Sequence, residues 1–252
     1  VVFNGESLQI DQTIVDRVTQ SFEFLKEFSE NKIIYGVNTG FGPMAQYKIQ
    51  DSERIQLQYN LIRSHASGTG NPISPRCVKA AMLARLNTLC LGHSGVHISV
   101  ITLMTELINR DITPLIFEHG GVGASGDLVQ LAHLALVLIG EGEVFYKGVL
   151  TPTEEVFKIE KLEPIKVELR EGLALMNGTS VMTGIGLVNT VNARKLLNWA
   201  VIASSAINEI VQAYDDHLSS ELNDAKKHIG QQQIAKTMRE YLKDSTLTRK
   251  RE

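Results

Sequence analysis

The sequence has few cysteines, little net charge and no long hydrophobic run, and each shortage excludes a class of protein. Two cysteines in 252 residues, Cys77 and Cys90, are too few for a disulfide framework or a zinc site. The formal net charge of −3 gives no argument for nucleic acid or a membrane surface as a partner. No apolar run reaches the roughly 18 residues of a membrane span, and no signal peptide opens the chain. We therefore expect a soluble cytoplasmic protein whose cysteines are buried thiols.

The remaining composition is that of a globular protein, and its periodicity predicts mainly helices. Asp11 can cap a helix that ends near Asn31. Further helices are expected over residues 52–66, 75–92, 97–109 and 128–139. Ser74 followed by Pro75 marks the start of the second of these. We expect a mainly α protein.

Two later segments refine this prediction. Residues 143–170 contain β-like runs and two prolines, and they predict a small hairpin excursion. From about Thr179 to Leu222 the sequence stays compatible with helix, a length that suggests a bundle or coiled assembly. Within it we expect hydrophobic side chains to form core: Leu196, Leu197, Trp199, Val201 and Ile202.

The stretch GGVGASGD at residues 120–127 allows three interpretations. It fits the G-x-G-x-x-G pattern of a dinucleotide cradle, it can be a plain turn, or its backbone can itself react. A dinucleotide fold needs strands that alternate with helices, and the chain offers too few. Glu141 and Glu143 lie near the distance at which an acid would bind the ribose, but they follow a helix stop.

The third interpretation rests on Ala124, Ser125 and Gly126. If the loop bends so that the Gly126 nitrogen meets the Ala124 carbonyl carbon, a five-membered ring can close. Loss of two waters, one of them from the Ser125 hydroxyl, gives 4-methylideneimidazol-5-one (MIO), a strong electrophile. The neighbouring glycines permit the unusual backbone angles of such a bend, and Asp127 could assist the proton transfers.

The segment around this loop resembles the prosthetic-group segment of the aromatic amino-acid ammonia-lyases, which act on histidine, phenylalanine or tyrosine. Three other segments match the family in order: YGVNTGFG at 35–42, NLIRSHASGTG at 60–70 and EGLALMNGTS at 171–180. The resemblance covers essentially the whole chain but only the N-terminal half of family members, and it is closest to bacterial tyrosine ammonia-lyases. It implies a long-helix bundle of the ammonia-lyase (fumarase/aspartase-like) type. We expect an MIO-bearing domain at 1–178 and the truncated start of the central bundle at 179–252.

The resemblance also implies roles for particular residues. Tyr35 is the general base that removes the substrate β-proton, and Asn177 binds the ring. An isolated phenol is protonated at neutral pH and is a poor base, so the site must favour its anion. Gly42 belongs to the loop that folds over the substrate.

Ser64 and His65 line the pocket for the substrate side chain in this resemblance. The Ser-His pair is typical of histidine lyases, but it also occurs in a tyrosine-lyase branch that the chain resembles elsewhere. A histidine side chain can hydrogen-bond a phenol as well as an imidazole. We favour tyrosine and keep histidine as the alternative substrate.

The implied reaction is a non-oxidative deamination that yields ammonia and a trans-α,β-unsaturated acid. It needs MIO, formed from Ala124, Ser125 and Gly126, but no metal and no dissociable cofactor. The family forms homotetramers with shared sites, and part of each site comes from the C-terminal half, so residues 1–252 alone are expected to be inactive. An aminomutase or a scaffold protein that retains the motif remains a minor alternative.

Overall fold

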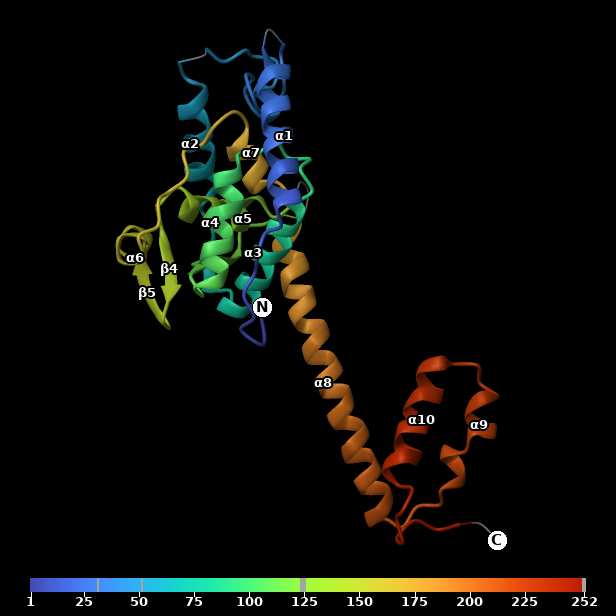
Figure 1. Cartoon of the computed structure of the whole chain (residues 1–252). Coiled ribbons are helices and arrows are strands. Elements are labelled where there is room, and N and C mark those ends of the chain that lie inside the picture. Colours follow the sequence, from blue (N-terminus) through green and yellow to red (C-terminus); the bar gives the residue numbers. More distant parts are fainter. Residues whose placement is uncertain (31, 51, 123–125, 251–252) are drawn as a thin grey trace. The chain divides into compact units, whose positions relative to one another are not determined.

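The computed structural model describes residues 1–30, 32–50, 52–122 and 126–250 (Figure 1). The chain divides into two compact units, Val1–Val188 and Asn189–Glu252. The division falls inside helix α8 (Ser180–Ile210). The functional domains 1–178 and 179–252 remain a prediction.

The first unit is mainly helical, as the sequence predicted. Asp11 caps α1, where its carboxylate accepts a hydrogen bond from the Thr13 N–H at 2.8 Å. Ser74 caps α3 in the same way, and Pro75 stands at the first helical position. Helices of this unit are α1 (Gln12–Ser29), α2 (Arg54–His65), α3 (Pro75–Leu89), α4 (Ile98–Asn109), α5 (Leu128–Leu138), α6 (Thr153–Glu160) and α7 (Glu171–Met176), with a 3-10 turn at Gly42–Met44.

Two small sheets accompany the helices, and every strand pair in the described residues is antiparallel. Strand β1 (Thr69–Pro72) pairs with β3 (Phe117–His119), and β4 (Glu143–Tyr146) lies between β2 (Thr113–Pro114) and β5 (Val149–Pro152). The β4–β5 hairpin confirms the predicted excursion.

The antiparallel sheets also exclude the dinucleotide interpretation of the glycine loop, because that fold is built on parallel strands. Glu141, one of the two candidate ribose ligands, instead accepts hydrogen bonds from the Arg63 guanidinium at 2.6 to 3.2 Å.

Helix α5 lies at the centre of the first unit, in contact with α2, α4 and α7 (Figure 1). Its residues Leu131, Ala132 and Leu138 have no exposed surface. They join a core with the inner faces of α3 and α4, where Met82, Leu89 and Met104 are fully buried. Since α5 begins directly after the glycine loop, the core fixes one end of that loop.

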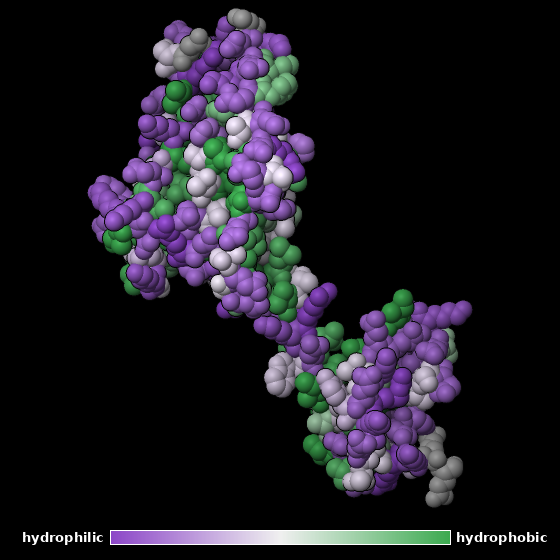
Figure 2. Space-filling view, viewed as in Figure 1, coloured by the Kyte–Doolittle hydropathy of each residue, from purple (hydrophilic) through white to green (hydrophobic). Residues whose placement is uncertain are grey.

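The second unit has a much smaller core. It contains the end of α8, a 3-10 turn at Asp216–Leu218, α9 (Ser220–Asp224) and α10 (Ile229–Tyr241). Val201 of α8 packs with Leu218 and Met238. Hydrophobic residues reach the surface in both units (Figure 2).

The prediction that all five apolar residues of α8 form core is wrong for four of them. Val201 is buried, but Leu196, Leu197, Trp199 and Ile202 are exposed. Trp199 keeps 69% of its surface accessible. The apolar residues cover more of the helix circumference than the small cluster around Leu218 can contact.

Helix α8 also ends earlier than the sequence suggested. Gln212 takes a left-handed conformation with φ 53°. The Ala213 N–H donates to the Asn208 carbonyl, and the Gln212 N–H donates to the Glu209 carbonyl. This closing pattern usually uses glycine, so the end at Ile210 had no sequence signal. None of the helices in the described residues is long and apolar enough to cross a membrane.

A fully buried carboxylate fixes the start of α7. Glu171 has no exposed surface, and it accepts hydrogen bonds from the backbone N–H groups of His97 at 2.6 Å and Glu168 at 2.8 Å. Burial raises the pKa of Glu171 to about 7, although the two donors act in the opposite direction. The side chain therefore joins α7 to the turn before α4.

We predict that Glu171→Gln removes a pH dependence of stability. The folded protein holds a proton that the unfolded chain releases at its ordinary pKa of 4.5. This contribution, at most about 3 kcal/mol, is complete below pH 4.5 and is lost as the pH rises through 7. Denaturant titrations between pH 4 and 8 should show this loss in the parent protein and not in the variant. Glu163→Gln, at an exposed position, is the control; an unchanged slope in Glu171→Gln would contradict the assignment.

Candidate functional site

Tyr35 lies on an exposed loop, and its hydroxyl is held from within that loop. The Gly42 N–H donates a hydrogen bond to the Tyr35 hydroxyl oxygen at 3.2 Å, and Phe41 contacts the Tyr35 ring edge-on with centroids 6.1 Å apart. These two contacts orient the Tyr35 phenol within the loop. About half of the Tyr35 side chain is exposed. Gly42, predicted as a loop residue of the site, is therefore a direct partner of Tyr35.

Helices α2 and α7 both contact the Tyr35 loop. The Gln58 side-chain amide of α2, which is buried, donates to the Gly36 carbonyl at 3.1 Å. Gly36 has φ 78°, and a methyl group on its Cα would lie 2.8 Å from Leu173 Cδ2 of α7. Only glycine combines this backbone angle with such close contact. Tyr35 is thus positioned next to α2 and α7.

Helix α7 contacts the Tyr35 loop near its start, and the residues that follow its end contact Gly126, which is predicted to form part of the ring. Asn177 ends α7, and its backbone N–H donates to the Leu173 carbonyl. Gly178 follows and lies directly against Gly126. Gly126 has φ 88°, and a methyl group on its Cα would lie 2.3 Å from the Gly178 oxygen. The adjacent Asp127 N–H donates to the same oxygen at 2.6 Å.

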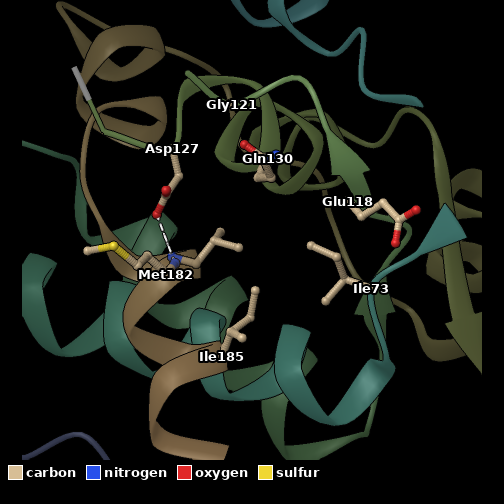
Figure 3. Close-up of a pocket in the computed structure, with 8 residues that line it drawn as sticks. Ile73, Glu118, Gly121, Asp127, Gln130, Met182 and Ile185 are labelled. Carbon is tan, nitrogen blue, oxygen red and sulfur yellow. Dashed lines mark hydrogen bonds between the residues drawn. The ribbon is translucent and has the colours of Figure 1, made fainter. Parts of the chain in front are cut away.

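Asp127 makes a second connection to the same region (Figure 3). Its carboxylate accepts from the backbone N–H groups of Val181 at 2.9 Å and Met182 at 3.0 Å. These donors belong to the first turn of α8, where unpaired N–H groups and the helix dipole favour a negative charge. The predicted role of Asp127 in proton transfer stays a prediction.

Ala124 and Ser125, the other two predicted ring-forming residues, lie outside the described residues. The described side of the loop fits the group they would form. Gly126 has the left-handed φ of a sharp bend, and Gly178 occupies the space that a side chain on Gly126 would need.

A buried arginine lies behind this contact. Arg85 of α3 is 3% exposed, and its guanidinium donates to the Ala174 carbonyl near the end of α7. A methyl group on Gly178 would meet the Arg85 Nη1 at 2.3 Å. Burial lowers the pKa of Arg85 to about 10. No pattern in the sequence indicates Arg85, because its contacts are with Ala174 and Gly178, far along the chain.

Ser64 and His65 form the C-terminal end of α2. The Ser64 hydroxyl lies 3.1 Å from the Leu61 carbonyl oxygen and 3.1 Å from His65 Nδ1. His65 Nδ1 in turn lies 2.9 Å from the same carbonyl oxygen. His65 is half-buried and Ser64 is exposed. Because Gln58 and His65 are seven residues apart, they share one face of α2.

The segment after α2 is held by a histidine that is not among the predicted site residues. His133 of α5 accepts the Gly68 N–H at Nε2, at 3.1 Å, and its ring contacts Phe117 edge-on. Burial lowers the pKa of His133, which favours the neutral ring that can accept this bond. His133 therefore ties the chain just beyond His65 to the central helix.

A pocket of about 290 Å³ opens beside the glycine loop, on the side of α8. Figure 3 shows Asp127, Gln130 and Glu118 around it, with Ile73 and Ile185 as apolar wall. Tyr35 and His65 do not line it. The part of the chain that the structure describes contains no cluster of three His, Cys, Asp or Glu side chains that could bind a metal.

The predicted residues that the structure describes thus belong to one connected framework in the first unit. Contacts through Gln58 and Leu173 join the Tyr35 loop to α2 and α7, and the end of α7 meets Gly126 and Asp127. Helices α2 and α5 are in contact. Ser64 and His65 stand at one end of α2.

Comparisons with known proteins show the family to which this chain belongs. The model of the family described as "Aromatic amino acid lyase" matches residues 1–252. A histidine ammonia-lyase of Halalkalibacterium halodurans is 39% identical over 249 residues, which are 98% of this chain and 49% of that protein. The chain spans about half the length of the curated relatives it matches.

Solved structures give the same result. A tyrosine aminomutase of Streptomyces globisporus is similar with a TM-score of 0.94 and 35% identity, over 99% of this chain and 47% of that one. A histidine ammonia-lyase of Trypanosoma cruzi is similar with a TM-score of 0.86 and 32% identity, over 94% of this chain and 46% of that one. Because the family model matches residues 1–252, this chain belongs to the aromatic amino acid lyase family.

Proposed function

We propose that the full-length protein is an ammonia-lyase that converts L-tyrosine to trans-4-coumarate and ammonia. The observation that carries the proposal is the hydrogen bond from the Gly42 N–H to the Tyr35 hydroxyl. The Tyr35 loop packs against α7, and Gly178, which follows α7, contacts Gly126. This geometry supports a tyrosine base on the same framework as the ring-forming segment.

In the proposed reaction, Ala124, Ser125 and Gly126 would form MIO, which supplies an electrophile that makes the substrate amine a leaving group. The Tyr35 phenolate takes a proton from the substrate β-carbon, and the C–N bond breaks as the new double bond forms. The Gly42 N–H would hold the Tyr35 oxygen in place for that transfer. The Gly126–Gly178 contact and the bonds of Asp127 hold the segment in position.

The substrate side chain would extend towards the end of α2. There His65 offers a polar group to the ring substituent, and His133 fixes the chain beyond it. Tyrosine is compatible with this site because the substrate phenol can form a hydrogen bond with the His65 side chain.

Histidine is the second candidate, with trans-urocanate as product. It is favoured by the curated relatives, which are histidine ammonia-lyases. An aminomutase is the third, since a similar solved structure is a tyrosine aminomutase. Incubation of the full-length protein with each amino acid separates them: 4-coumarate and urocanate absorb at different ultraviolet wavelengths, and an aminomutase returns a β-amino acid without free ammonia. No reaction with any amino acid would overturn the proposal and leave the scaffold alternative.

The assembly and location are also proposals. We infer a cytoplasmic homotetramer whose sites combine this chain with the C-terminal half and with other subunits. Exposed apolar residues on α8, among them Leu196 and Trp199, provide surface for such contacts. Cys77 and Cys90 are both free thiols, but the prediction that both are buried is wrong for Cys77, which is partly exposed, whereas Cys90 is buried.

We predict that Tyr35→Phe in the full-length protein removes turnover but leaves the ring formed. Loss of a general base costs about 10²–10⁴-fold in rate, whereas the ring forms from other residues. Lyase activity and borohydride-sensitive absorbance, measured together, separate the two effects. Loss of both would mean that Tyr35 supports the structure and not the proton transfer.

Gly126→Ala should instead abolish the ring and the activity together. Alanine at this left-handed φ costs about 1–2 kcal/mol, and its methyl group would collide with the Gly178 carbonyl. The electrophile is measured by its borohydride-sensitive absorbance. Gly186→Ala is the control, because a methyl group there meets no atom within 4 Å. A Gly126→Ala protein with normal absorbance would show that the contact is not required.

His65→Phe should shift preference from tyrosine towards phenylalanine. A site built to hydrogen-bond a hydroxyl rejects the analogue that lacks it, here by about 100-fold or more, and the variant loses that bond. The ratio of kcat/KM for tyrosine and phenylalanine measures the effect. An unchanged ratio would mean that His65 does not contact the substrate ring.

A further inference from the structure

Arg85 of α3 is a buried cation that lacks a carboxylate partner. It is 3% exposed, and none of the ion pairs found among the described residues includes it. Burial lowers the pKa of its guanidinium to about 10, so the group still carries a positive charge at neutral pH. A buried charge that no opposite charge compensates destabilises a fold. Specific contacts of the guanidinium must therefore offset this cost.

The contacts of the guanidinium lie at the end of α7. Arg85 Nη2 donates a hydrogen bond to the Ala174 carbonyl. Nη1 lies so close to Gly178 that a methyl group on the Gly178 Cα would clash with it. The third nitrogen, Nε, is buried and has no hydrogen-bond partner in the part of the chain that the structure describes. The guanidinium is thus held by α7 and by the turn that follows it.

Gly178 connects Arg85 to the segment predicted to form the ring. The Gly178 oxygen accepts the Asp127 N–H at 2.6 Å, and the Gly178 backbone occupies the space that a side chain on Gly126 would need. After Arg85, the residue nearest to a methyl group on Gly178 is Leu131 of α5, which has no exposed surface. Because Arg85 and Leu131 are both buried, the turn at Gly178 cannot move towards them.

We propose that Arg85 is a positioning residue for formation of the ring. Its guanidinium holds Gly178 in contact with Gly126, and this contact keeps the Gly126 backbone bent for ring closure. The inference rests on the proposed function, because that function supplies the ring. A shorter or apolar side chain at position 85 would leave space beside Gly178, and the backbone of Gly126 could then relax away from the bend.

The covalent steps balance within the three residues of the ring. A bond forms between the Gly126 nitrogen and the Ala124 carbonyl carbon. The Ala124 oxygen leaves as water with the amide hydrogens of Ser125 and Gly126, and a C=N bond forms between the Ala124 carbon and the Ser125 nitrogen. The Ser125 hydroxyl leaves with the Ser125 Cα hydrogen as the second water. Arg85 exchanges no atom in these steps, so it changes the rate of ring formation and not the later turnover.

The shape of the guanidinium is as important as its charge. Its planar fork directs separate nitrogens at separate sites, here the Ala174 carbonyl and Gly178. A lysine keeps the charge and can donate to the Ala174 carbonyl, but it has no second nitrogen to contact Gly178. We therefore expect Arg85→Lys to form the ring slowly although its charge is unchanged.

The experiment compares full-length proteins made by cell-free synthesis. Mass spectrometry measures, at successive times, the fraction of the peptide containing residues 124–126 that has lost two waters. The variants are Arg85→Lys and Arg85→Ala. Lys79→Met is the matched control, because Lys79 is another buried cation of α3 but pairs with Asp111. Circular dichroism and thermal unfolding report whether each variant folds.

We expect ring formation to be about 100-fold slower in both Arg85 variants, since a displacement of about 1 Å at a reacting centre costs about that factor. Guanidinium chloride, far below denaturing concentrations, should restore ring formation in Arg85→Ala. Methylammonium chloride, which carries the same charge without the planar fork, should not. Divided by the fraction of sites that carry the ring, kcat should equal that of the parent protein.

Ring formation at the parent rate in a folded Arg85 variant would overturn the inference, and Arg85→Lys decides if Arg85→Ala does not fold. Equal slowing in Lys79→Met would also overturn it, because lost stability would then explain the effect. Failure of guanidinium to rescue a folded Arg85→Ala protein, or equal rescue by methylammonium, would count against it in the same way. A parent protein that carries the ring but turns over no amino acid would overturn the proposed function and leave this inference standing.

Discussion

The structure of the site depends on one backbone contact, between Gly126 and Gly178. Gly126 lies so close to Gly178 that a methyl group on its Cα would be 2.3 Å from the Gly178 oxygen. The contact joins the start of α5 to the turn between α7 and α8. Asp127 binds the same region twice, through its own N–H and through its carboxylate. A loop tied at several points can retain a strained backbone, because the surrounding structure determines its geometry.

Helix α7 is the short element on which the other parts meet. Glu171 fixes its start through two backbone donors, Leu173 supports the Tyr35 loop, and Arg85 binds its last turn. Glu171, Leu173 and Arg85 are all buried. Helix α7 therefore cannot shift without breaking several contacts in a low-dielectric interior. The loop of Tyr35, the proposed base, and Gly126 therefore keep a fixed relation, which is what the proposed proton transfer next to a leaving amine requires.

Local signals predicted the helices well, and long-range relations were the part that could not be predicted. Asp11 and the Ser74-Pro75 pair mark helix starts in any context, and both predictions were confirmed. The site residues could be named only through a family resemblance. The contact of Gly126 with Gly178 and the bond from Gly68 to His133 join segments far apart in sequence, and no periodicity indicates them. The apolar face of α8 was recognised, but periodicity does not say what covers it, and Trp199 proved exposed.

The most direct test is the mass of the peptide that contains residues 124–126, after proteolysis of the unaltered full-length protein. We expect the mass of this peptide to be two water molecules below the mass calculated from its sequence, because the contact between Gly126 and Gly178 would compress the segment until the ring closes. A peptide of unreduced mass, from a protein that still releases ammonia from an aromatic amino acid, would contradict it.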